Sequence, residues 1–120
     1  MNFNDITFDQ YQKIAITTEL MQRSDVINAN DPAFVAKLLG LSGEAGEVAE
    51  KFKKIIRDRG GIITPSDIQD IVKELGDVLW YISAVADYLG VSLEKVASEN
   101  LNKVLSRKAR GQSRGSGDNR

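Results

Sequence analysis

Two long stretches of helical periodicity, separated by a short glycine-containing turn, constrain the fold of this chain most strongly. Within residues 32–57 and 66–89 apolar residues recur at three- and four-residue spacing, and the sequence Arg-Gly-Gly follows the first stretch. As a helix the first stretch is on the order of 40 Å long at 1.5 Å per residue, and the second is nearly as long. Two such helices form an antiparallel hairpin, the natural nucleus of a helical bundle.

Capping signals place four helices along the chain, and no alternating run is long enough to predict a strand. We expect a first helix over about residues 7–23 and a second, opened by a capping aspartate and a proline, over about residues 32–57. A third is expected over about residues 66–89. Ser92 then caps a fourth helix, which ends near Lys108. The sequence therefore predicts an all-α fold.

The length of the chain indicates one domain. We assign residues 1–110 to an all-α domain and residues 111–120, rich in glycine, serine and arginine, to a basic C-terminal tail. A chain of 120 residues has a modest core, so we expect a homo-oligomer to complete the helical bundle. Neither a membrane span nor a secretion signal is apparent, so we expect a cytoplasmic protein without a membrane partner. The tail alone is weak support for nucleic acid as a partner, and we do not expect one.

The chain contains no cysteine and no histidine. These absences exclude a disulfide framework, the usual zinc ligands, Cys-His nucleophilic pairs and Ser-His-Asp triads. Any chemistry must therefore rely on carboxylates, lysine, arginine and hydroxyl groups.

Two pairs of carboxylates carry the strongest chemical signal. Glu44 and Glu47 share a face of the second helix, and Glu74 and Asp77 share a face of the third. In an antiparallel hairpin the pairs can converge, and four carboxylates at one point repel strongly unless a divalent cation lies among them. All-oxygen ligation without histidine indicates Mg²⁺ or Mn²⁺ and, with it, a phosphorylated substrate.

A solvated helix face is the alternative interpretation of the acidic residues. Glu47 with Lys51, and Glu50 with Lys54, form favourable pairs at four-residue spacing, as expected on an exposed helix surface. On that interpretation the acidic stripe binds nothing.

Glycines inside the two long helices favour the metal interpretation. Gly40, Gly43 and Gly46 interrupt the second helix and Gly76 the third, at a cost of about 1 kcal/mol each relative to alanine. We expect their small size to allow the close helix approach that brings facing carboxylates together.

Further residues are candidates for contact with the substrate. Asn100, Lys103 and Arg107 lie on one face of the fourth helix and could hold a phosphate chain, although a solvated C-terminal helix would also carry such cations. Trp80 and Tyr81 could stack on a base, although aromatic residues at this spacing are more often part of a core.

The motifs resemble those of a known family. The segments GEAGEVAEKFKK, ELGDVLWYISAVADYLG and NLNKVLSRKARG are similar to the MazG-type all-α nucleoside triphosphate pyrophosphohydrolases, whose mark is E-x-x-E, a spacer and E-x-x-D. In this chain the motif comprises Glu44 and Glu47, 26 intervening residues, and then Glu74 and Asp77.

The resemblance implies a four- to five-helix MazG-like fold that assembles as a homodimer or homotetramer. It also implies Mg-dependent hydrolysis of a nucleoside triphosphate to the monophosphate and pyrophosphate, which clears unwanted nucleotides from the pool. Glu44, Glu47, Glu74 and Asp77 would hold the metal. Glu47 and Glu50 are both candidates for the general base that accepts the proton of the attacking water. The alternative function is a non-catalytic helical adaptor with a solvated acidic face and a basic tail.

Overall fold

The computed structural model describes residues 2–111, and four helices with no strand make up this part of the chain. The helices are α1 (Phe8–Ile16), α2 (Pro32–Arg59), α3 (Pro65–Tyr88) and α4 (Leu93–Ala109). The expected all-α fold is confirmed. Of the expected tail, residues 111–120, all but residue 111 lie outside the described residues.

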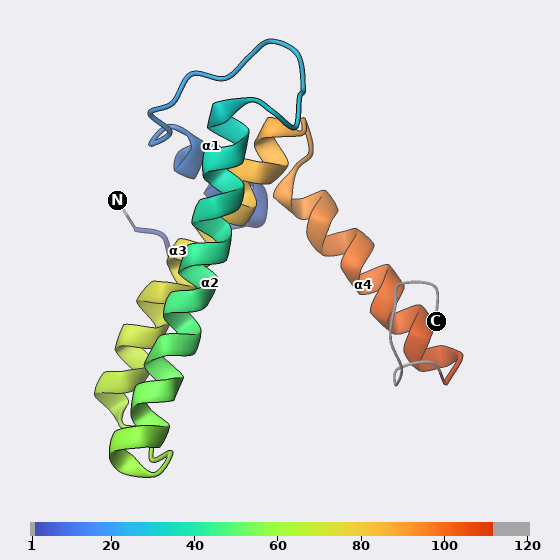
Figure 1. Cartoon of the computed structure of the whole chain (residues 1–120). Coiled ribbons are helices and arrows are strands. Elements are labelled where there is room, and N and C mark those ends of the chain that lie inside the picture. The colour runs from blue at the N-terminus through green and yellow to red at the C-terminus, as the bar shows by residue number, and fades with distance from the viewer. Residues whose placement is uncertain (1, 112–120) are drawn as a thin grey trace.

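The helices α2 and α3 form a long antiparallel hairpin, and the other two helices gather at one end of it (Figure 1). Helix α1 packs against α3 near the open end of the hairpin. Helix α4 starts at that end and diverges from the hairpin along its length (Figure 1). No described helix is both long enough and apolar enough to cross a membrane.

Local capping explains where the hairpin helices begin and end. Asp31 Oδ1 accepts the backbone N–H of Ala33 at 3.0 Å, which opens α2. Gly60 adopts φ = 63° and ends α2 in the left-handed conformation that glycine favours. Thr64 and Asp67 form a reciprocal capping box, so that α3 begins one residue earlier than the sequence predicted.

Helix α1 is shorter than expected, because it ends at Ile16 and not near residue 23. The hydroxyl groups of Thr17 and Thr18 donate back to the carbonyls of Ile14 and Ala15, at 2.6 and 2.7 Å. Such bonds satisfy the last carbonyls of the helix and compete with its continuation.

The segment after α1 turns toward α2 because an ion pair holds it there. Glu19 Oε2 lies 2.6 Å from the Nζ atom of Lys37, whose side chain is buried. The expected boundary was therefore wrong for two reasons: the local hydroxyl bonds of Thr17 and Thr18, and this tertiary contact of Glu19.

A buried glutamine joins the three elements at the open end of the hairpin. The amide nitrogen of Gln12 donates to the carbonyls of Ser83 and Val91, and its amide oxygen accepts the backbone N–H of Leu93 at 3.0 Å. Because Leu93 is the first residue of α4, Gln12 satisfies one of the unpaired donors of that helix. One side chain therefore links α1 to the end of α3 and the start of α4.

Large apolar side chains remain exposed along the two helices that diverge. Helix α3 presents an apolar stripe formed by Ile68, Val72 and Leu75, of which Val72 is 59% exposed. Helix α4 presents Leu101 and Leu105 in the same way. The buried apolar residues are mostly small or lie near the open end, so a single chain leaves much apolar surface in contact with water.

Candidate functional site

Three carboxylates converge between the middle parts of α2 and α3. Glu44 of α2 and Glu74 and Asp77 of α3 each place one carboxylate oxygen within 4.8 Å of the others. Glu44 and Glu74 are half-buried, whereas Asp77 is exposed. We call these three residues the acidic cluster. Three of the four predicted acidic residues therefore come together, and they come from both halves of the hairpin.

The carboxylates of the acidic cluster repel one another. Burial raises the pKa of the Glu44 carboxyl above its ordinary value, and the negative charges of Asp77, Glu74 and Glu47 raise that pKa further. The neighbouring carboxylates therefore oppose the ionisation of Glu44. A cation at this point would remove the repulsion.

The donor set of the cluster fits a hard divalent cation. Carboxylate oxygens are the ligands that Mg²⁺ and Mn²⁺ prefer, and two oxygens on opposite sides of a magnesium ion lie about 4.2 Å apart. The three carboxylate oxygens of the cluster all lie within 4.8 Å of one another, which is close to this separation. The residues present therefore fit a metal.

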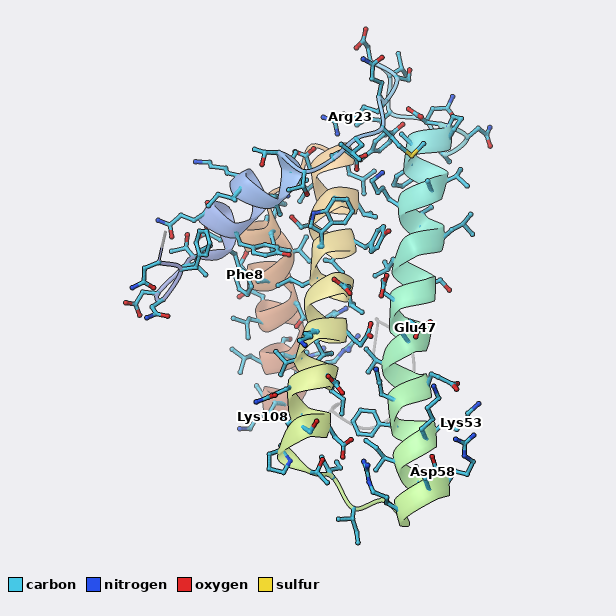
Figure 2. All side chains as sticks on the ribbon, turned by 90° about the vertical axis from the view of Figure 1, so that its left-hand side faces the viewer. Phe8, Arg23, Glu47, Lys53, Asp58 and Lys108 are labelled. Atoms are coloured by element: carbon cyan, nitrogen blue, oxygen red, sulfur yellow. The ribbon has the colours of Figure 1, made fainter. Side chains whose placement is uncertain are left out.

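The two other acidic residues of α2 differ in their surroundings. Glu47 is exposed, lies beside the middle of the hairpin (Figure 2) and contributes to the raised pKa of Glu44, but it is outside the three-carboxylate group. Glu50 lies 3.0 Å from the Nζ atom of Lys53 and 3.9 Å from that of Lys54. The hydrogen bond with Lys53 lowers the pKa of Glu50, which makes it a weaker base.

The aromatic pair after the E-x-x-D motif packs into the fold. Trp80 Nε1 donates to the carbonyl of Ala15 at 3.2 Å and to Thr18 Oγ1 at 2.9 Å, and thereby fixes α1 on α3. The Tyr81 ring meets the Trp80 ring edge-on, with centroids 4.9 Å apart. Tyr81 also lies directly over the backbone of Gly40, where a Cβ atom would collide with its ring.

The expectation that the interior glycines allow the helices to approach closely holds only at Gly40. A Cβ atom built on Gly43, Gly46 or Gly76 meets no other described atom within 4 Å. Within one chain, these three glycines border open space and do not support close helix packing. The expectation was wrong for them because the sequence does not show which helix face meets the partner helix.

The predicted phosphate-binding row lies apart from the acidic cluster in a single chain. Asn100 and Lys103 line a shallow hollow on α4, and Arg107 lies on the same helix. Helix α4 contacts α1 and α3 but not α2 among the described helices, and Figure 1 shows it leaving the hairpin. The fold of one chain therefore does not bring this row to the carboxylates.

Sequence reasoning did not place Tyr11 or Lys51 at the cluster, and it paired Lys51 with Glu47 instead. The charge of Asp77 adds to the effect of burial in raising the pKa of Tyr11, which places the phenol of α1 near the cluster. Lys51 Nζ lies 4.0 Å from Glu74 Oε1, across the hairpin. The spacing of seven residues between Glu44 and Lys51 could have indicated a shared face, whereas Tyr11 carried no signal.

A family model and a curated relative match this chain. The model of the MazG nucleotide pyrophosphohydrolase domain matches residues 34–111, which is more than half of the chain. The chain belongs to the MazG nucleotide pyrophosphohydrolase family. The MazG match contains the acidic cluster, and the all-α fold agrees with it.

A curated relative is the Gene 37 protein of Mycobacterium phage L5. It is 55% identical over 82 residues, which cover 68% of this MazG chain and 72% of the phage protein. Its name states no activity. No match to a solved structure was found.

Proposed function

We propose that the chain hydrolyses nucleoside triphosphates to monophosphates and pyrophosphate with Mg²⁺ or Mn²⁺, and that it removes unwanted nucleotides from the pool. The observation that carries this proposal is the convergence of Glu44, Glu74 and Asp77 between α2 and α3, within the span that matches the MazG domain. The electrostatic strain of the cluster supports a cation at this point, because nothing else described there neutralises three carboxylates fully.

In this proposal the acidic cluster holds the metal, and Glu47 acts beside it. A bound divalent cation supplies neutralisation of the phosphate oxygens and a lower pKa for water. The water oxygen forms a bond to one phosphorus of the α–β bridge, the bond between that phosphorus and the bridging oxygen breaks, and the nucleoside monophosphate and pyrophosphate separate. Glu47 is exposed beside the cluster and accepts the proton of the water. Glu50 is less suited, because its lysine contacts lower its pKa.

A homodimer or homotetramer is part of the proposal. The exposed apolar stripes of α3 and α4 and the open space over Gly43 and Gly76 leave surface that a second chain can cover. A second copy would also allow the exposed Asn100 and Lys103 to reach a triphosphate held at the hairpin of its partner, whereas Arg107 is buried in the single chain. Tyr81, which lies near this part of the hairpin, remains a candidate for contact with the nucleoside, and Trp80 supports it.

Pyrophosphate release is the direct test. A panel of canonical and modified nucleoside triphosphates is incubated with the protein and Mg²⁺ or Mn²⁺. We expect Asp77→Asn to lower kcat on the order of 100-fold or more, because groups beside a metal have effects of this size. Asp25→Asn, in the exposed loop before α2, is the matched control and should keep wild-type activity.

The same assay separates the enzyme from the adaptor. A non-catalytic helical adaptor would release no pyrophosphate from any triphosphate of the panel. Wild-type turnover by Asp77→Asn would contradict the assignment of the acidic cluster as the metal site. Circular dichroism of each variant checks that the helices remain folded.

A further inference from the structure

The structure pairs Lys51 with a member of the acidic cluster. The sequence favours an exposed pair between Lys51 and Glu47 on the same helix, but the structure places the Lys51 ammonium 4.0 Å from Glu74 on the opposite helix. Lys51 lies seven residues after Glu44, which corresponds to about 10 Å along α2. It is therefore a cation at the edge of the cluster, on the side toward the turn of the hairpin.

The ion pair between Lys51 and Glu74 is weak, so that Lys51 can exchange Glu74 for another anionic partner. The separation of 4.0 Å is at the outer limit for an ion pair, and the Lys51 side chain is 38% exposed. Pairs of this kind contribute little to stability, because water screens the charges and ordering a long side chain costs entropy. Among the described residues, Glu74 is also the only carboxylate that forms an ion pair with Lys51.

The surroundings leave the Lys51 side chain room to move. Lys51 borders a pocket of about 140 Å³ between α2 and α3, at the turn side of the cluster. The acidic groups of this pocket are partly satisfied elsewhere: Asp67 pairs with Arg59, and Asp58 pairs with Arg57. The flexible stem of lysine can therefore take up more than one position without losing a strong partner.

From these observations we propose that Lys51 is a displaceable counterion, which pairs with Glu74 in the metal-free protein and binds a phosphate oxygen of the substrate once Glu74 ligates metal. The proposal rests on the function proposed above. An ammonium group and a divalent cation compete for the same carboxylate group of Glu74. When that carboxylate binds metal, a polyphosphate chain offers the ammonium group a new anionic acceptor at the edge of the cluster.

A purely structural role for Lys51 makes different predictions. If the ammonium group only relieves repulsion within the cluster, its removal lowers the stability of the metal-free protein and leaves substrate binding unchanged. If Lys51 is a displaceable counterion, its removal changes the affinity for metal and the affinity for the triphosphate in opposite directions. Its removal strengthens metal binding and weakens triphosphate binding.

The test uses Lys51→Met, which removes the charge and keeps the length of the side chain, with Lys51→Arg as the charge-preserving variant. Lys53→Met is the matched control on the same helix. Lys53 pairs with Glu50 at 3.0 Å and projects away from α3 (Figure 2), so it leaves the cluster untouched. Mn²⁺ affinity of the nucleotide-free protein is measured by electron paramagnetic resonance, and KM and kcat by pyrophosphate release.

For Lys51→Met we expect Mn²⁺ affinity to rise about 2- to 5-fold, which corresponds to the loss of a weak competing ion pair. We expect KM for the triphosphate to rise roughly 10-fold or more, because a charge-assisted hydrogen bond is lost, while kcat changes less. Lys51→Arg, which keeps the charge, should have a KM close to that of the wild-type protein. Lys53→Met should leave the Mn²⁺ affinity and the KM unchanged.

The outcomes separate this inference from the proposed function. If the wild-type protein releases no pyrophosphate, the proposed function fails, and Mn²⁺ binding, which needs no turnover, still decides whether Lys51 competes for Glu74. If the wild-type protein is active and Lys51→Met has unchanged KM, or binds Mn²⁺ no more tightly, the role of Lys51 as a displaceable counterion is overturned.

Discussion

At the scale of single residues, the three glycines of α2 differ in what surrounds them. Gly40, Gly43 and Gly46 look equivalent in the sequence, since each interrupts the same helical pattern. In the structure only Gly40 lies beneath the ring of Tyr81, and the other two border open space. Gly40 is therefore required by packing within the chain, whereas Gly43 and Gly46 leave the surface near Glu44 and Glu47 uncovered.

This difference predicts opposite effects of two identical substitutions. Gly40→Ala should lower the free energy of unfolding by about 1–3 kcal/mol, because the added methyl group displaces the Tyr81 ring. Gly46→Ala should raise it by up to about 1 kcal/mol, because alanine is the better helix former and meets no described atom. Urea unfolding measures both. Equal effects of the two substitutions would show that the Tyr81 contact does not restrict residue 40.

At the scale of helices, the buried Gln12 holds three elements in place. Its side chain satisfies the carbonyls of Ser83 and Val91 and the backbone N–H of Leu93. These groups lie at the end of α3 and the start of α4, where helix geometry leaves backbone atoms without partners. The direction in which α4 leaves the hairpin therefore depends on a residue of α1.

We expect Gln12→Ala to lower the free energy of unfolding by about 2–4 kcal/mol, because it leaves buried backbone groups unsatisfied and creates a small cavity. Gln10→Ala is the control on the same helix. It removes one member of an exposed capping box and should cost about 1 kcal/mol or less. Thermal unfolding followed by circular dichroism compares the two variants. A loss for Gln12→Ala no larger than for Gln10→Ala would contradict this account of Gln12.

Features that depend on neighbouring residues in the chain could be predicted, and those that depend on tertiary contacts could not. The starts of α2 and α4 follow from Asp31 and Ser92, because capping is a local interaction. The end of α1 follows only in part from the hydroxyl bonds of Thr17 and Thr18, since the contact between Glu19 and Lys37 joins distant segments.

The distinction between local and tertiary interactions also applies to the acidic cluster. Glu44, Glu74 and Asp77 were predicted to converge, because the spacing within each helix and the antiparallel hairpin together fix their heights. The displacement of Glu47 from this group and the pairing of Lys51 with Glu74 depend on how the two helices rotate about their axes. A sequence pattern with a period of 3.6 residues does not determine that rotation closely enough.

At the scale of the whole molecule, the single chain is open on one side. The α3 stripe of Ile68, Val72 and Leu75 is exposed, and α4, which diverges from the hairpin (Figure 1), carries exposed leucines of its own. Apolar surface of this extent is covered in most soluble assemblies. The arrangement is the reason for proposing that two or more chains form the complete bundle.

We expect sedimentation at micromolar concentration to give at least twice the 13.2 kDa mass of one chain. Val72→Glu should shift the protein toward monomers, because it places a charge in the α3 stripe. Leu20→Glu, at a loop position that is 93% exposed, should not. An active wild-type monomer would contradict the proposed assembly.

The location of the acidic cluster within one hairpin has a consequence for the order in which the chain folds. Helices α2 and α3 are neighbours in the sequence, and contacts between neighbouring elements form early, because little loop entropy opposes them. The repulsion among Glu44, Glu74 and Asp77 is therefore met at the start of folding. We therefore expect these carboxylates to slow the folding of the hairpin, and a divalent cation to accelerate that step as well as to stabilise the folded protein; refolding rates measured with and without Mg²⁺ check this.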